Sequence, residues 1–182
     1  HAETQAAAMT LTPPGTAASP NTILCVLRTG TVPPVSADLR TTATISTTGN
    51  NALIWAGGHA YIYGIINNCG SGAVATVLTF GNGACFYHMK NCALRKLGTS
   101  AANPAINFGP TSGLASVLLE NTTMEFSHAS DSIGVRNLYF LWKDTPTAIT
   151  GATLPTTLFS TTTLAGHTIL DGVDLSALGS GK

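Results

Sequence analysis

The sequence predicts an all-β protein, and more specifically a short parallel β-helix of about five coils. Three observations support this fold class. From residue 23 onward, Thr, Val, Ile, Tyr and Phe occur in short runs separated by Gly, Asn, Pro or Ser, as in strands joined by turns. No stretch of a dozen residues carries the periodic apolar stripe of a helix. A unit of two short strands followed by Asn or Asp is repeated along this region.

The N-terminal segment, residues 1–22, has the composition of an extended arm. It is rich in Ala and Pro, and its large apolar side chains are Met9 and Leu11. Together with Pro13 and Pro14 they form a candidate interface, because such a segment cannot bury a core by itself. We expect the arm to be held by its own domain or, as we favour, by a neighbouring subunit. Residues 23–182 are expected to form a single all-β domain.

The repeated units follow a strand predicted at 40–46 and a turn at 47–51. Each unit contains a short strand, a brief turn, a second strand and a polar anchor residue. The predicted strand pairs are 52–56 with 60–66, 76–80 with 85–89, 105–108 with 116–119, 133–135 with 138–142, and 157–159 with 168–170.

The anchors are spaced as the coils of a β-helix require. They recur at intervals of 23, 30, 23 and 27 residues: Asn68, Asn91, Asn121, Asp144 and Asp171. Apolar landmarks in the first strand of four units recur at intervals of 28, 27 and 24 residues: Phe80, Phe108, Val135 and Phe159. One coil takes roughly 20–30 residues, and stacked strands lie about 4.8 Å apart. Asn side chains at equivalent turns can therefore form a ladder of hydrogen bonds.

An alternative fold is compatible with the same residues, because Asn and Asp are favoured in turns of any all-β domain. Residues 80–84 would then form a hairpin turn, and the chain would fold as a β-sandwich or jelly roll. The two architectures differ in strand pairing, which is parallel in a β-helix and antiparallel in a sandwich.

In coil period and Asn series, residues 51–178 resemble the right-handed parallel β-helix superfamily. This superfamily includes pectate-lyase-like enzymes, phage tailspikes and short capsid-bound spikes. The resemblance carries over no catalytic motif. It therefore implies a structural protein of a large assembly, most like a phage or virus capsid decoration (cement) or spike protein. Such a protein would lie on the capsid surface of the virion, as a homotrimer.

The charge composition favours association with other protein chains. Charged residues make up 9% of the sequence, against about 25% in an ordinary soluble domain. Eight basic and eight acidic residues balance to a net charge of zero. The chain therefore lacks both strong self-repulsion and the basic field that nucleic acid requires. We expect its partners to be other copies of itself and a capsid or filament protein, with no nucleic acid and no membrane.

Candidate catalytic carboxylates are few. Enzymes of this superfamily need two or three carboxylates on one face, to hold a cation or to act as an acid and base pair. Only Glu120 with Asp144 or Glu125 could meet across adjacent coils. Glu120 is as well suited to ion pairs with Lys90 or Lys143 above and below it. We therefore predict ion pairs at this position and no enzymatic activity.

No metal or other cofactor is expected either. Four histidines occur far apart in the sequence and lack the spacing of metal ligands: His59, His88, His128 and His167. Ser71 lies between two glycines but outside a Gly-x-Ser-x-Gly motif. The cysteines are expected to be buried free thiols, with a bridge between Cys69 and Cys92 as the alternative: Cys25, Cys69, Cys85 and Cys92.

Six aromatic residues could line a sugar-binding platform or belong to the core and subunit interfaces: Trp55, Tyr61, Tyr63, Tyr87, Tyr139 and Trp142. We favour a place in the core and at subunit interfaces, because Tyr and Trp are enriched at interfaces. Two other functions stay open. One is a secreted carbohydrate-binding or carbohydrate-cleaving β-helix, and the other is an extracellular filament subunit whose N-terminal strand completes the next subunit's sheet.

Overall fold

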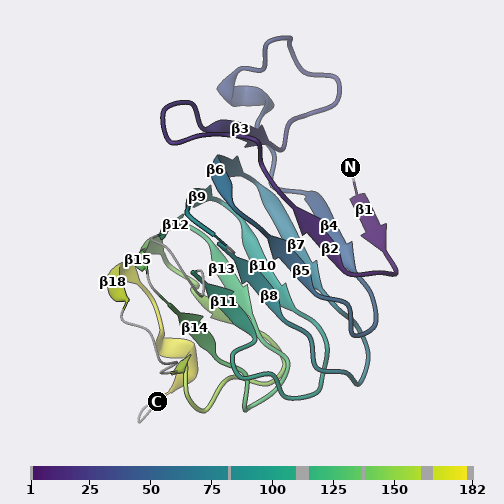
Figure 1. The fold of residues 1–182 in the computed structure, drawn as a ribbon, viewed down its shortest axis with the longest axis vertical. Coiled ribbons are helices and arrows are strands. Elements are labelled where there is room, and N and C mark those ends of the chain that lie inside the picture. Colours follow the sequence, from purple (N-terminus) through teal and green to yellow (C-terminus); the bar gives the residue numbers. More distant parts are fainter. Residues whose placement is uncertain (1, 82, 110–114, 137, 161–165, 180–182) are drawn as a thin grey trace.

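The computed structural model describes residues 2–81, 83–109, 115–136, 138–160 and 166–179. These residues form a parallel β-solenoid with three six-stranded sheets, here called A, B and C (Figure 1). Every described pairing between named strands is parallel. The predicted fold class is therefore confirmed, and the sandwich alternative is excluded.

Each coil contributes one strand to each sheet, in the order A, B, C. Sheet A consists of β1 (Ala2–Gln5), β4 (Ala43–Thr47), β7 (Ile65–Cys69), β10 (Ala93–Lys96), β13 (Thr123–Glu125) and β16 (Ile149–Thr150). Sheet B consists of β2 (Met9–Leu11), β5 (Leu53–Trp55), β8 (Leu78–Phe80), β11 (Ile106–Phe108), β14 (Ile133–Val135) and β17 (Phe159–Ser160). Sheet C consists of β3 (Asn21–Leu24), β6 (Gly58–Tyr63), β9 (Cys85–Lys90), β12 (Ala115–Glu120), β15 (Leu138–Thr145) and β18 (His167–Val173).

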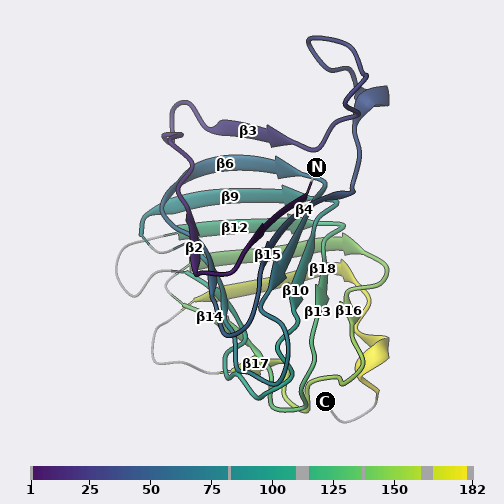
Figure 2. The same ribbon diagram turned by 90° about the vertical axis from the view of Figure 1, so that its right-hand side faces the viewer.

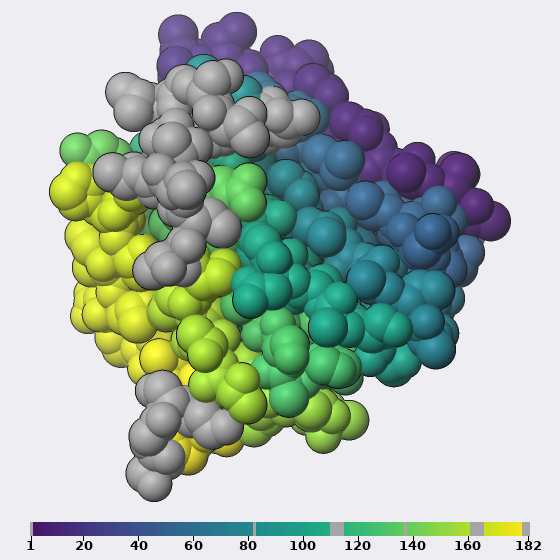
Figure 3. Space-filling view, turned by 60° about the horizontal axis from the view of Figure 1, so that its bottom comes forward, coloured from purple at the N-terminus to yellow at the C-terminus, as the bar shows by residue number. Residues whose placement is uncertain are grey.

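Successive coils lie side by side along one axis. In Figure 2 the strands of sheet C follow one another downward from β3 at the top through β6, β9 and β12 to β18, and Figure 3 shows the chain order as bands of colour from purple to yellow on the surface. Two short 3₁₀ turns, η1 (Ser36–Asp38) and η2 (Ser176–Leu178), complete the described elements.

The predicted two-strand units correspond to sheets B and C. Between residues 51 and 178 each of these sheets has five strands, as the predicted coil number requires. The strand predicted at 40–46 corresponds to β4, but the third strand of each later coil, in sheet A, was not predicted as a separate element. The strand expected at 60–66 in fact turns at Gly64, where φ is 75° and the chain passes from β6 to β7. A corner made by one residue leaves no loop signal in the sequence.

Aromatic rings stack in the core across successive coils. The ring centroids of Trp55 and Phe80 are 6.4 Å apart, and those of Phe80 and Phe108 are 5.5 Å apart, with both pairs near parallel. Burying each of these side chains contributes about 1.5–3 kcal/mol. The regular spacing of apolar landmarks in the sequence thus corresponds to side chains stacked on successive coils. Phe159 is an exception, because it pairs with Ile133 and not with Val135.

The segment predicted as a separate arm forms the first coil of the solenoid. β1, β2 and β3 pair in parallel with β4, β5 and β6. Met9 and Leu11 are half-buried against the core, Pro13 is buried and Pro14 is exposed. Backbone pairing with the next coil supplies the stability that the segment's composition lacks. Residue 22 therefore marks no boundary between an arm and a domain.

Between β3 and β4, residues 26–39 leave the solenoid and project beyond its first coil (Figures 1 and 2). Val26 and Leu39 form an isolated antiparallel bridge at the base of this projecting loop. Within the loop, the Asp38 carboxylate accepts hydrogen bonds from the Thr31 hydroxyl (2.6 Å) and from the backbone N–H groups of Thr31 and Val35. The hydroxyl bond is the largest cause that lowers the pKa of Asp38. The loop is thus held in one shape by its own polar contacts.

Candidate functional site

Sheet C has the longest strands of the solenoid, with six to eight residues in each strand from β6 to β18. Alternate residues of each strand point outward, and the strand register aligns them into three rows along the axis. The first row is His59, Phe86, Ser116, Tyr139 and His167. The second row is Thr22, Tyr61, His88, Leu118, Leu141 and Ile169. The third row contains the charged residues Lys90, Glu120, Lys143 and Asp171.

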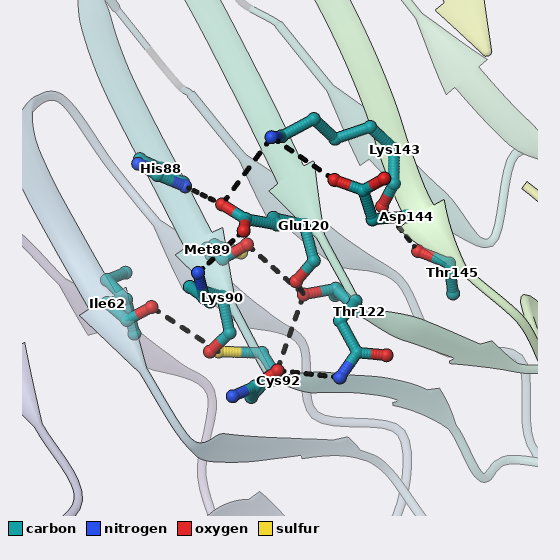
Figure 4. Close-up of polar contacts among 12 residues, drawn as sticks. Ile62, His88, Met89, Lys90, Cys92, Glu120, Thr122, Lys143, Asp144 and Thr145 are labelled. Atoms are coloured by element: carbon teal, nitrogen blue, oxygen red, sulfur yellow. Dashed lines mark hydrogen bonds and ion pairs between the residues drawn. The ribbon is translucent and has the colours of Figure 1, made fainter. Parts of the chain in front are cut away.

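The charged row has Glu120 at the centre of a cluster (Figure 4). Its carboxylate lies 2.6 Å from Lys90 Nζ, 3.1 Å from His88 Nε2 and 3.9 Å from Lys143 Nζ. Lys143 Nζ also lies 3.2 Å from the carboxylate of Asp144. The predicted ion pairs of Glu120 with the lysines of adjacent coils are confirmed.

Glu120 is poorly suited to act as a general acid. Its hydrogen bond from Lys90 is the main cause that holds the pKa of Glu120 below its ordinary value, and the same bond raises the pKa of Lys90. A catalytic acid needs a raised pKa. Glu125 lies on sheet A, where its carboxylate is 3.1 Å from Arg95 Nε. Of the two predicted partners, Glu125 therefore lies apart from Glu120, and Asp144 meets Glu120 through their shared contact with Lys143 Nζ.

A column of left-handed backbone residues follows the charged row at the corner between sheets C and A. Its members have φ values between 45° and 75°: Gly64, Asn91, Asn121, Asp144 and Gly172. Asn121 Nδ2 donates to Asn91 Oδ1 (2.6 Å), and Asn91 Nδ2 donates to the Tyr63 hydroxyl (2.8 Å). The structure thus brings Asn91, Asn121 and Asp144 to equivalent positions and makes the first two part of a hydrogen-bonded ladder.

Asn68 and Asp171, the other two predicted anchors, do not share this column. Asn68 lies within β7, on the outer side of sheet A, and its Nδ2 donates to Ser46 Oγ (3.1 Å). Asp171 belongs to the charged row, one residue before the corner. Gly64 and Gly172 occupy the corner positions in their coils, because glycine adopts positive φ at no steric cost.

His59, His88 and His167 lie on the outer face of sheet C, on different strands. His59 borders a cavity on that sheet, and His167 stacks on Tyr139 with 5.0 Å between ring centroids. His128 Nδ1 accepts a hydrogen bond from the Ser130 N–H. No group of three or more potential metal ligands occurs among the described residues.

The four cysteines are buried free thiols, as expected. Burial raises the pKa of Cys85 and of Cys92 to about 11. Ser71 Oγ accepts a hydrogen bond from the Gly49 N–H (2.9 Å), which places the hydroxyl in a turn between coils.

The predicted aromatic residues divide into two groups. Core positions are taken by Trp55, Tyr87 and Trp142, and outer positions on sheet C by Tyr61, Tyr63 and Tyr139. A cavity of about 330 Å³ lies beside Tyr139 and is also bordered by Phe86 and Ser116. Phe86 was missed in the sequence, although its place between the inward Cys85 and Tyr87 indicates an outward side chain.

A buried ion pair was also missed. Lys96 Nζ lies 2.9 and 3.0 Å from the two carboxylate oxygens of Asp131, and both side chains are inaccessible to solvent. Lys96 also donates to the Ser100 carbonyl (2.6 Å), and Asp131 accepts three backbone N–H groups, among them that of Ala102. Such complete pairing indicates a structural role.

No family model, curated protein or solved structure matches the chain. In the part of the chain that the structure describes, no helix is long and apolar enough to span a membrane.

Proposed function

We propose that the protein is a non-enzymatic structural subunit of a larger assembly, and that the first-coil end of its solenoid docks on a partner. One observation carries this proposal. β1, β2 and β3 are the edge strands of all three sheets at this end, and every residue of β1 is exposed. The free side of an edge strand can pair with another chain.

Two further features of the same end support docking. An apolar cavity of about 280 Å³ opens there, bordered by Leu11, Ile23 and Trp55. The projecting loop carries Val32 with 97% and Val35 with 53% of its surface exposed. Exposed apolar groups gathered in one region are typical of an interaction site.

The opposite end is partly covered. There η2 contributes a buried Leu178, and Leu175 packs against the same core cluster. Two of its edge strands, β16 and β17, have only two residues each, and short edges discourage pairing with other chains. The third edge strand, β18, has seven residues, most of them exposed. The covering 3₁₀ turn and the short edges of sheets A and B favour docking through the first coil.

The assembly that fits best is the capsid of a phage or virus, to which the protein would be bound as a decoration or spike protein. This finer assignment is supported by the resemblance to capsid-bound β-helix proteins and by a near-neutral composition suited to permanent contact. In an extracellular filament, the same end would instead receive the next subunit.

Co-sedimentation tests the proposal. Large particles from the source of the chain are separated on a density gradient and probed with an antibody against the protein. We expect the protein in the particle fraction, and a Val32→Lys/Val35→Lys variant in the light fraction. Thr153→Lys, which changes an exposed residue of a distant turn, should stay with the particles. Wild-type protein confined to the light fraction would contradict a capsid role, and polymers of the pure chain would favour the filament.

Carbohydrate binding is a second candidate, favoured by the cavity between Phe86 and Tyr139. Aromatic rings at the rim of a cavity suit contact with the apolar face of a sugar. A polysaccharide ligand would raise the melting temperature of the wild type and not that of Phe86→Ala or Tyr139→Ala. No shift with a panel of acidic and neutral polysaccharides would remove this candidate. Cleavage with Glu120 as the general acid is disfavoured, because the hydrogen bond from Lys90 holds the pKa of Glu120 below its ordinary value.

A further inference from the structure

We infer that the outer face of sheet C pairs with the same face of a second copy of the chain, about a two-fold axis that runs parallel to the strands. This inference goes beyond the proposed function, because it concerns a different surface and does not depend on the first-coil end. It follows from the order of side chains in the three rows.

The charged row alternates in sign along the axis: Lys90, Glu120, Lys143 and Asp171. A two-fold axis in the interface, parallel to the strands, sets each row against itself in reversed order. With the axis midway between β12 and β15, Lys90 faces Asp171 of the second copy and Glu120 faces its Lys143. All four positions of the row then meet an opposite charge.

The alternation of charge in this row favours a two-fold axis between β12 and β15 over axes at the neighbouring positions. An axis centred on β12 would set Glu120 against Glu120 of the second copy, and an axis centred on β15 would set Lys143 against Lys143. An axis between β9 and β12 would leave Lys143 opposite Tyr63. Like charges placed directly opposite disfavour an arrangement strongly. The charged row therefore favours the axis between β12 and β15, because that register pairs all four of its charges and sets no like charges together.

The other two rows are complementary in the same register. In the second row, Leu118 faces Leu141 of the second copy, and the reverse contact is made by symmetry. In the first row, the small Ser116 faces Tyr139 of the second copy, whose side chain is among the most exposed apolar groups of the structure. The cavity beside Ser116 and Phe86 provides space for that ring.

The area of this face predicts a weak dimer. Four strands about 4.8 Å apart, each with six residues rising about 3.3 Å, cover roughly 400 Å² in projection. A standard interface buries about 800 Å² per partner. We therefore expect a concentration-dependent equilibrium, in which the half-exposed ion pairs set the register more than the affinity.

A charge-swap experiment tests the arrangement. In Glu120→Lys, the new lysine faces Lys143 of the second copy, and in Lys143→Glu, the new glutamate faces Glu120. Each variant alone should dimerise at least roughly tenfold more weakly than the wild type in sedimentation velocity. In an equimolar mixture of the two, every position of the charged row again meets an opposite charge, so the dimer should reappear as a heterodimer.

The matched control is the half-exposed pair Arg95 and Glu125 on sheet A. Arg95→Glu and Glu125→Lys change the same kinds of charge on another face and should leave dimerisation unchanged. Ser116→Trp fills the cavity without a charge change and should also weaken the dimer at least roughly tenfold. Melting curves confirm that each variant is folded, and Ser116→Trp decides the matter if the charge variants are not.

Several outcomes would overturn the inference. They are a wild type that stays monomeric at about 1 mM, a trimer such as the resemblance implies, a mixture that fails to recover the dimer, or an equal loss in the sheet A controls. Val32→Lys/Val35→Lys should dimerise like the wild type. Failure of the particle test and failure of the dimer test are therefore separate results.

Discussion

Lys96 and Asp131 lie 35 residues apart in the sequence and form an ion pair that is completely buried in the solenoid. Lys96 ends β10 and Asp131 precedes β14, so the pair joins adjacent coils. Opposite charges in such a place are tolerated because each is paired and its remaining hydrogen-bonding groups are satisfied.

Removing one partner of this pair should be severe. Lys96→Met leaves the Asp131 carboxylate buried without a counter-ion, and we expect a loss of about 3–5 kcal/mol in the free energy of unfolding, measured with urea. Arg95→Met, one residue earlier and half-exposed, should cost at most about 1 kcal/mol. Equal losses in the two variants would show that the buried pair has no special role.

Asn121 has a positive φ at its corner, so replacing it with alanine should destabilise the protein more than replacing it with glycine. Alanine should destabilise the protein more than glycine, by about 1 kcal/mol, because only glycine adopts positive φ without strain. At Asn68, which lies within a strand, the order should be reversed. Thermal or urea unfolding of the four variants measures this. The same order at both positions would contradict the difference between corner and strand.

The thiols of Cys85 and Cys92 should be inert in the folded protein. Their pKa values are raised to about 11 by burial, so both stay protonated at pH 8, and the thiolate is the reactive form. Ellman's reagent should give little colour before urea is added, and the signal of four thiols afterwards. Rapid labelling of the native protein at either cysteine, located by peptide mapping, would contradict this burial.

Glu120 should contribute a small, pH-dependent stability. Its folded-state pKa is depressed below the ordinary 4.5, chiefly by the hydrogen bond from Lys90. Its contribution is therefore present above that ordinary value and lost as the pH falls through the depressed one. Relative to Glu120→Gln, the wild type should be more stable by at most about 1 kcal/mol at pH 7, with the gap closing in acid. If the stability difference between wild type and Glu120→Gln grew as the pH fell, the depressed pKa of Glu120 would be contradicted.

Single-residue corners explain why the repeat could be predicted but its register could not. Asn91, Asn121 and Asp144 are visible as turn residues, and the structure brings them together. Asn68 has the same side chain as Asn91 but lies on a sheet, because Gly64 already makes the corner of that coil. The sequence contains both candidates and nothing local that separates them.

The first coil and the buried ion pair were missed for a related reason. Residues 2–24 have weak strand preferences and become strands only by pairing with β4, β5 and β6. Lys96 resembles a surface lysine until the next coil brings Asp131 against it. In both cases the stabilising partner comes from a different coil, which no local pattern reports.

By itself, the sequence determined the all-β class and the coil period, because these depend on the spacing of residues along the chain. Tertiary structure alone decided the third sheet, the folding of the first coil onto the solenoid and the rows of side chains on sheet C. Those features depend on which residues of different coils come to lie about 4.8 Å apart, and the strand register decides which residues these are.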